Sequence, residues 1–203
     1  MKKLQSITYV FLICATLSAC NDDNDSNAPQ DKGLSKEISA LVPAEILQKL
    51  KNLGMPIHEG LNPPDIQIKF HCSPLVLKAT NVKDDIYDPG HVFADYFGTF
   101  YDQDNDKLTI KMDYTNGPET GTGLGSFISG TGSDFSVFAE IEGEAHGDKA
   151  RLIQVLSGTI TNTGIKNLHL ANFMLEGGDE SEYWIDNGEG RVTYDSDGHS
   201  ELE

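Results

Sequence analysis

The sequence predicts an all-β protein, an antiparallel meander of about eight or nine strands that closes into a barrel behind one short N-terminal helix. Apolar and polar residues alternate over 65–72, 107–114 and 135–141, as they do in strands with one buried face. Turn residues recur between such segments, and no second helical pattern follows the first. Consecutive hairpins form a closed barrel or a sandwich. We favour the barrel, because closure removes exposed strand edges.

Residues 43–53 predict the single helix. Pro43 suits the first position of a helix, and Gly54 suits its C-terminal end. Between them, apolar residues recur at helical spacing, so one face of this helix is apolar. That face would plug the end of the barrel or pack against its side. The apolar residues are Ile46, Leu47, Leu50 and Leu53.

Two irregularities are expected within the strands. Leu168 and Leu170 share one parity, whereas Phe173 and Leu175 share the other, which predicts a bulge near 171–172. A glycine-rich stretch covers Gly121 to Ser126, but a strand pattern follows it. A phosphate-binding loop needs a helix at that point, so we interpret the glycines as a kinked or closely packed strand.

The N-terminus has the layout of a secretory signal peptide. Lys2 and Lys3 are followed by an apolar run over 7–17, and small residues come next. This run is shorter than the ~20 residues that a membrane-spanning helix needs. Leu17-Ser18-Ala19-Cys20 resembles the bacterial lipobox. The resemblance implies that a peptidase cuts before Cys20 and that the Cys20 thiol carries a diacylglycerol, with further acylation such as palmitate giving a durable anchor.

We therefore divide the chain into a lipoprotein signal peptide (1–19), a lipidated Cys20 with an acidic disordered tether (20–35) and one domain (36–203). The segment 21–25, Asn-Asp-Asp-Asn-Asp, resembles the acidic export tag of surface lipoproteins in Bacteroidota. It predicts a lipid-anchored protein on the exposed face of a bacterial outer membrane. A position facing the periplasm is the alternative.

The charge of the chain argues against a nucleic-acid partner, and its cysteine content argues against an intramolecular disulfide. The chain has 32 acidic and 15 basic residues and a net charge of −17, which argues against a nucleic-acid partner. Cys14 is lost with the signal peptide, and the Cys20 thiol becomes a thioether. Cys72 then has no partner for an intramolecular disulfide. Its parity within the strand predicts a buried, inert thiol.

No catalytic pattern stands out. The six histidines lack the spacing of a zinc site, and the chain has no Gly-x-Ser-x-Gly elbow. We expect no enzymatic activity and no cofactor. A hydrolase assembled from distant segments is the third hypothesis for function.

One acidic turn is a candidate calcium site. Asp102, Asp104 and Asp106 occupy positions 1, 3 and 5 of a calcium-loop register, with Asp113 at position 12. Lys107 stands at position 6, where such a loop needs glycine. The segment is therefore either a polar hairpin turn or an irregular calcium site.

Three aromatic residues are candidates for ligand contact: Trp184, Tyr96 and Phe97. They lie at or near predicted loops and strand ends, where aromatic rings stack on sugars or hold apolar ligands. The alternative is that they close one end of the barrel.

Several short stretches resemble an uncharacterised family of Bacteroidota surface lipoproteins, over most of residues 43–203. The resemblance implies no activity and no catalytic residues. More loosely, a helix with a meandering barrel is similar to the lipocalin-type calycins, which hold small apolar ligands. The lipocalin Gly-x-Trp is absent, and this chain has Gln67-Ile68-Lys69-Phe70 there. The stretches that carry the family resemblance are 62–64, 127–130, 135–138, 157–158 and 164–168.

The leading hypothesis is a lipid-anchored binding module of the cell envelope that holds a small apolar or glycan ligand. Its partners would be the membrane, through the N-terminal lipid, and a small ligand or an envelope protein. The alternative is a structural or interaction lipoprotein with a packed barrel and no ligand pocket.

Overall fold

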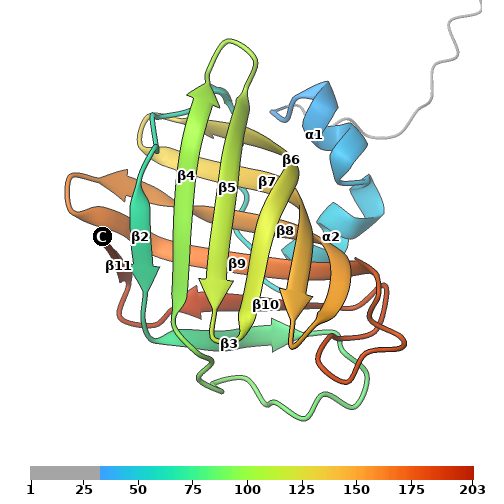
Figure 1. Cartoon of the computed structure of the whole chain (residues 1–203). Coiled ribbons are helices and arrows are strands. Elements are labelled where there is room, and N and C mark those ends of the chain that lie inside the picture. The colour runs from blue at the N-terminus through green and yellow to red at the C-terminus, as the bar shows by residue number, and fades with distance from the viewer. Residues whose placement is uncertain (1–32) are drawn as a thin grey trace, which may run out of the picture.

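A computed structural model describes residues 33–203 of the chain (Figure 1). Two helices precede the strands in sequence. The elements are α1 (Lys36–Leu41), α2 (Ala44–Asn52), β1 (Leu61–Asn62), β2 (Lys69–Cys72), β3 (Leu75–Thr80), β4 (Tyr96–Asp104), β5 (Thr109–Asn116), β6 (Glu119–Thr131), β7 (Asp134–Ala145), β8 (Asp148–Thr161), β9 (Gly164–Glu176), β10 (Gly190–Asp195) and β11 (His199–Leu202).

The strands confirm the predicted all-β, barrel-like fold. They form one eleven-stranded sheet, in which eight strands make a closed ring in the order β11-β2-β4-β5-β6-β7-β8-β9. The ring closes where the start of β9, at 164–166, pairs with β11. Farther along, β9 pairs through 169–173 with β10 instead, and β3 pairs with the other edge of β10. Strands β10 and β3 therefore branch out of the ring.

Figure 1 shows how this branch meets the rest of the ring. Strands β4, β5 and β6 form the front of the barrel, and β7, β8 and β9 cross behind them. Strands β10 and β3 run across the ends of the front strands, next to the tight turn between β5 and β6. The interior consequently ends here against β10, β3 and nearby loops.

Most of the interior is filled by side chains. Phe70, Phe100 and Phe135 come from three different strands and are essentially inaccessible to solvent. Phe100 contacts both other rings, at centroid distances of 5.3 Å to Phe70 and 6.1 Å to Phe135. Aromatic pairs at such distances stabilise a core beyond the area that they bury.

Two helices, rather than the single one expected at 43–53, cover the outer face of β7 to β10. Helix α2 matches the prediction, with Pro43 immediately before it and Gly54 in a left-handed conformation after it. Helix α1 was not predicted, because six residues are too few for a helical period to show. Ser35 caps α1 by accepting a hydrogen bond from the backbone N–H of Ile38.

The helices bury a second face of the rear strands. Phe138, Val155 and Phe173 point outward from β7, β8 and β9 and pack against apolar residues of α1 and α2. The expectation of one buried face is therefore wrong for these strands. The bulge expected near 171–172 is wrong for the same reason. Strand β9 keeps a regular register there, and Phe173 faces the helices instead of the interior.

The glycine-rich stretch of β6 forms a kinked strand, as expected. Its register against β7 shifts by one residue between Gly123 and Gly125, which leaves Leu124 as the bulged residue. The side chain of Leu124 is exposed to solvent.

The outer edge of β3 is covered by the chain that follows it. Val76 forms an isolated bridge with Val92. The backbone N–H of Leu77 donates to the carbonyl of His91, and the N–H of Phe93 donates to the carbonyl of Leu75, both at 2.8 Å. This edge is therefore paired with segment 90–93 instead of facing solvent.

Leu50→Ala should test whether the helices stabilise the barrel. Leu50 is fully buried between α2 and the outer sheet face, so its truncation should lower the free energy of unfolding by about 2–5 kcal/mol. Urea denaturation followed by circular dichroism measures this change. Gln48→Ala, on the exposed face of the same helix, is the control and should stay within about 0.5 kcal/mol of the parent. A similar small effect for Leu50→Ala would contradict this packing.

Candidate functional site

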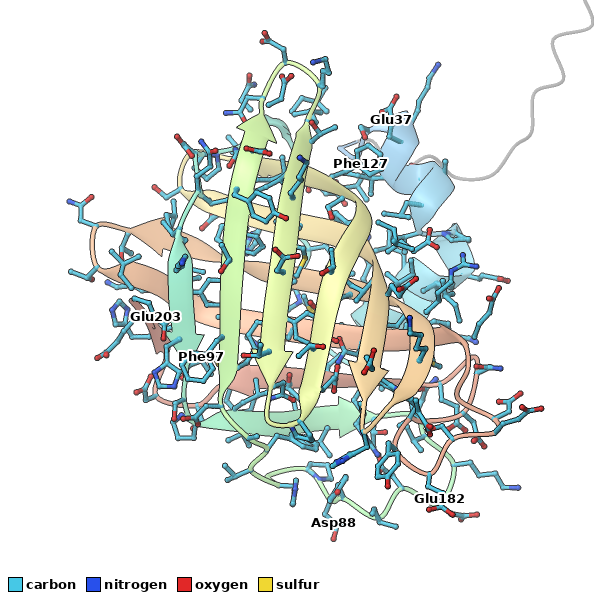
Figure 2. The ribbon with its side chains drawn as sticks, viewed as in Figure 1. Glu37, Asp88, Phe97, Phe127, Glu182 and Glu203 are labelled. Atoms are coloured by element: carbon cyan, nitrogen blue, oxygen red, sulfur yellow. The ribbon has the colours of Figure 1, made fainter. Side chains whose placement is uncertain are left out.

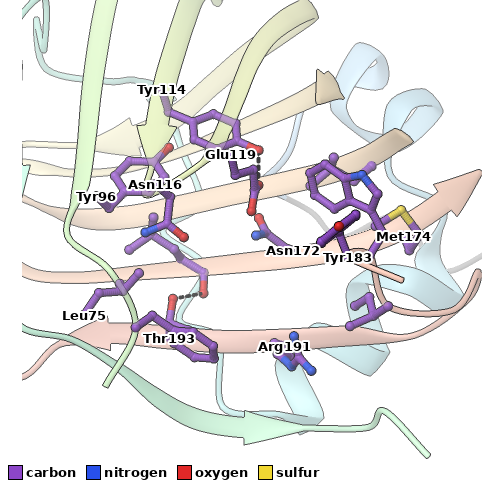
Figure 3. A pocket seen from close by; sticks show the side chains of 15 residues that line it. Leu75, Tyr96, Tyr114, Asn116, Glu119, Asn172, Met174, Tyr183, Arg191 and Thr193 are labelled. Atoms are coloured by element: carbon purple, nitrogen blue, oxygen red, sulfur yellow. Dashed lines mark hydrogen bonds between the residues drawn. The ribbon is translucent and has the colours of Figure 1, made fainter. Parts of the chain in front are cut away.

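A small pocket lies at the end of the interior, where the front strands meet β9, β10 and β3 (Figure 3). Its volume is about 100 Å³. An apolar cavity of ~150 Å³ holds a benzene molecule, so this pocket suits a ligand of that size or smaller. It is lined by Leu75, Phe93, Tyr96, Tyr114, Asn116, Glu119, Leu152, Leu170, Asn172, Met174, Tyr183, Trp184, Ile185, Arg191 and Thr193.

Stacked tyrosine rings form one wall of the pocket. Tyr96 of β4 and Tyr114 of β5 lie 5.2 Å apart and nearly parallel. Gly121 of the neighbouring strand makes room for this pair, because a Cβ atom at Gly121 would lie 2.2 Å from the Tyr114 ring. A side chain at this position would displace the ring from the pocket wall.

Trp184 also lines the pocket and comes from the loop between β9 and β10. The indole lies over Gly143, where an added Cβ would approach the ring to 3.0 Å. Its Nε1–H donates to the backbone carbonyl of Asp148 at 3.2 Å. Ser181 donates to the Asp148 carboxylate at 2.8 Å and accepts the backbone N–H of Trp184. The loop is thereby attached to the turn between β7 and β8.

Glu119 places a carboxyl group among these aromatic rings. The Tyr114 hydroxyl donates a short hydrogen bond to Oε1 of Glu119 (Figure 3). Burial raises the pKa of Glu119 and outweighs this hydrogen bond and the nearby charge of Arg191, both of which lower it. Burial also raises the pKa of Tyr114 well above its ordinary value. Tyr114 therefore remains the donor of this pair.

A chain of hydrogen bonds fixes the inner end of the pocket. The Tyr96 hydroxyl donates to Oε1 of the buried Gln154 at 2.8 Å. Nε2 of Gln154 then donates to Oδ1 of Asn172 at 2.9 Å. The second bond uses the Asn172 oxygen as an acceptor, so the Asn172 amide nitrogen is the group that remains for a ligand.

Arg191 fastens a second loop over the pocket. Its Nε and Nη2 atoms donate to the two oxygens of Asp85, at 2.9 and 2.7 Å. The guanidinium also lies over the rings of Tyr87 and Phe93, at 5.1 and 6.0 Å. Burial raises the pKa of Asp85, but hydrogen bonds from Arg191 and Thr80 outweigh it and lower that pKa to about 2.

The structure brings together two of the three predicted aromatic contacts. Tyr96 and Trp184 both line the pocket. Phe97 does not, because successive residues of a strand point to opposite faces. Phe97 lies on the outer side of β4, where it stacks on His71 at a centroid distance of 4.4 Å (Figure 2).

The acidic turn at 102–106 is engaged in ion pairs. Asp102 pairs with Lys111 at 2.8 Å, and Asp104 pairs with Lys107 at 2.6 Å. Asp104 also accepts the backbone N–H of Asp106 at 3.1 Å, as in a polar turn. Residues 33–203 contain no group of three or more His, Cys, Asp or Glu side chains arranged to hold a metal ion.

The remaining predicted sites concern cysteines. Cys20 lies outside the described residues. Cys72 is fully buried in β2 and is not part of a disulfide. Burial and the neighbouring Asp195 raise the pKa of the Cys72 thiol, which keeps the thiol protonated.

Sequence reasoning missed Glu119 and Arg191. Glu119 follows the turn at Gly117-Pro118 and shares its strand parity with Gly121. A charged residue in line with glycines that leave space inside a barrel is a usable signal. Arg191 has no comparable local signal, because its partner Asp85 comes from a distant loop.

No family model, curated protein or solved structure matches this chain, so the site is interpreted from its own geometry. Within residues 33–203, neither helix has the length and apolar character needed to cross a membrane.

The Asp85–Arg191 pair should make stability depend on pH. Because the pKa of Asp85 is lowered from 3.8 to about 2 on folding, the pair stabilises the protein above pH 4 and less as pH falls toward 2. Asp85→Asn should therefore cost about 2 kcal/mol at pH 7, and this difference should shrink toward pH 2. Urea denaturation at both pH values measures it.

Asp88→Asn is the matched control, since Asp88 is an exposed carboxylate of the same loop. It should change stability by less than about 0.5 kcal/mol at either pH. A cost for Asp85→Asn that does not vary with pH would contradict the role given to the ion pair.

Proposed function

We propose that this protein is a lipid-anchored binding module of the bacterial cell envelope, and that it holds a small ligand in the pocket at the end of its barrel. The observation that carries the proposal is the pocket itself. Tyr96, Tyr114 and Trp184 surround a few polar groups that converge on one small space. Apolar and aromatic walls with few oriented polar groups are typical of small-molecule sites.

The lining favours binding over catalysis. The described residues around the pocket include no histidine, cysteine or serine. A hydrolase of the common kinds needs such a nucleophile with a base in hydrogen-bond reach. Glu119 would act here as an acceptor for a ligand donor, held in place by Tyr114.

The N-terminal motif supports the anchored part of the proposal. Residues 17–20 have the lipobox pattern, and the acidic stretch after Cys20 favours display on the outer membrane surface. Helix α1, the first helix that packs on the barrel, begins after its N-cap, Ser35. The roughly 15 residues between Cys20 and Ser35 allow a reach of at most about 50 Å from the membrane.

A packed interaction module is the second candidate. The filled interior favours it, since Phe70, Phe100 and Phe135 leave the ring without a large central cavity. In that case the loops around the pocket would contact a partner protein, and Trp184 would close the barrel end.

Trp184→Ala should abolish ligand retention. Its removal takes away one wall of the pocket, so a bound mass seen by native mass spectrometry of the gently extracted full protein should be lost. Phe97→Ala is the matched control, because this aromatic residue lies outside the pocket and its removal should leave the bound mass. Circular dichroism checks that both variants are folded. A bare protein mass for the parent protein would instead favour the packed interaction module.

Cys20→Ala should release the protein from membranes. The substitution removes the thiol that would carry the lipid, so radiolabelled palmitate should not be incorporated and the protein should appear in the soluble fraction. Cys14→Ala, a cysteine inside the signal peptide, should keep both the label and the membrane association. Palmitate retained by Cys20→Ala would refute lipid anchoring at this residue.

A further inference from the structure

The charges around the pocket do not balance. Glu119 and Arg191 are the charged residues among those lining it within the described part of the chain. Arg191 makes two hydrogen bonds to Asp85, at 2.9 and 2.7 Å, and this ion pair neutralises its charge. Glu119 is thus the carboxyl group at the pocket that is not paired with Arg191, and its ionised form carries the unbalanced negative charge.

Besides the amide nitrogen of Asn172, which is a donor, two side chains at the pocket have an acceptor oxygen left for a ligand. Oε1 of Glu119 accepts from Tyr114, and none of the hydrogen bonds described for residues 33–203 uses Oε2. Asn116 donates through Nδ2 to the carbonyls of Ala94 and Asp95, at 2.6 and 3.2 Å. Its side-chain oxygen therefore remains as another acceptor on the wall of the pocket. A ligand that bonds Glu119 and Asn116 must supply N–H or O–H donors.

The aromatic rings add to the preference for positive charge. Tyr96, Tyr114, Tyr183 and Trp184 line the same space as the Glu119 carboxyl group. Aromatic faces attract cations, and the attraction is larger where water is partly excluded. The overall charge of −17 also favours the approach of cations over anions.

We propose that the ligand is a small organic ammonium ion, whose N–H groups bond Glu119 while its short apolar part lies against Trp184. This inference rests on the proposed function, since it assigns a ligand class to the same pocket. The volume of about 100 Å³ limits the ligand to a few carbon atoms around the charged group. An anionic ligand is disfavoured, because the Arg191 guanidinium already pairs with Asp85 through Nε and Nη2.

The chain contains a single tryptophan, so its fluorescence reports directly on this pocket. The full protein is titrated at pH 7.5 and constant ionic strength with butylammonium, 1-butanol and butyrate, which have similar size and different charge. Butylammonium should shift the Trp184 emission saturably. 1-Butanol should require at least ~10-fold higher concentration, because hydrogen bonds to charged groups are stronger than neutral ones. Butyrate should have no effect.

Glu119→Gln should remove the preference, so that butylammonium binds within about 2-fold of 1-butanol. Glu144→Gln is the matched control. It removes the same charge from an exposed position of β7 and should leave the preference unchanged. An equal loss in both variants would mean that net charge, and not Glu119, causes the preference, and would overturn the proposal.

Two other outcomes are distinguishable. Equal binding of 1-butanol and butylammonium by the parent protein would overturn the ammonium ligand and leave the binding module standing. The absence of any response to all three probes would overturn the small-ligand function itself, and with it this inference.

Discussion

The sharing of one edge of β9 between two strands is the constraint on which the structure depends. The first part of β9 bonds β11 and closes the ring, and the later part bonds β10. One strand edge cannot pair with both partners at the same residues. The ring is therefore closed at one end only, and at the other the branch of β10 and β3 opens a space under the front strands. Loops carrying Phe93 and Trp184 cover that space, and the pocket is what they leave unfilled.

Burial of the rear strands on both faces separates stability from binding. In β9, Leu170 and Met174 face the interior and line the pocket, whereas Ala171 and Phe173 face the helices. Neighbouring residues of β9 thus have different roles, since one set lines the pocket and the other packs against the helices. Substitutions on the outer face act on the packing of α1 and α2, while substitutions on the inner face change the shape of the pocket.

Local patterns predicted the fold well and the site only in part. Alternation and turn residues indicated the barrel, and helical spacing indicated α2, because both depend on near neighbours in sequence. The outer packing of Phe173 was misread as a bulge, since sequence alone does not show that helices cover the rear face. Tyr96 and Trp184 were predicted from their type and place. Glu119 and Arg191 were not, because ring closure and a loop from far away in the chain give each its partner.

The covered edge of β3 bears on whether copies of this protein associate when they are crowded together. An open strand edge is a template on which copies of a β protein polymerise, and the danger grows with local concentration. Here the backbone groups of Leu75 and Leu77 are already bonded to the following segment. Ile86, an exposed apolar residue nearby, lies in an irregular loop that offers no ladder to extend. Molecules packed side by side at high density could contact one another at the covered edge of β3 without adding strands to one another's sheets.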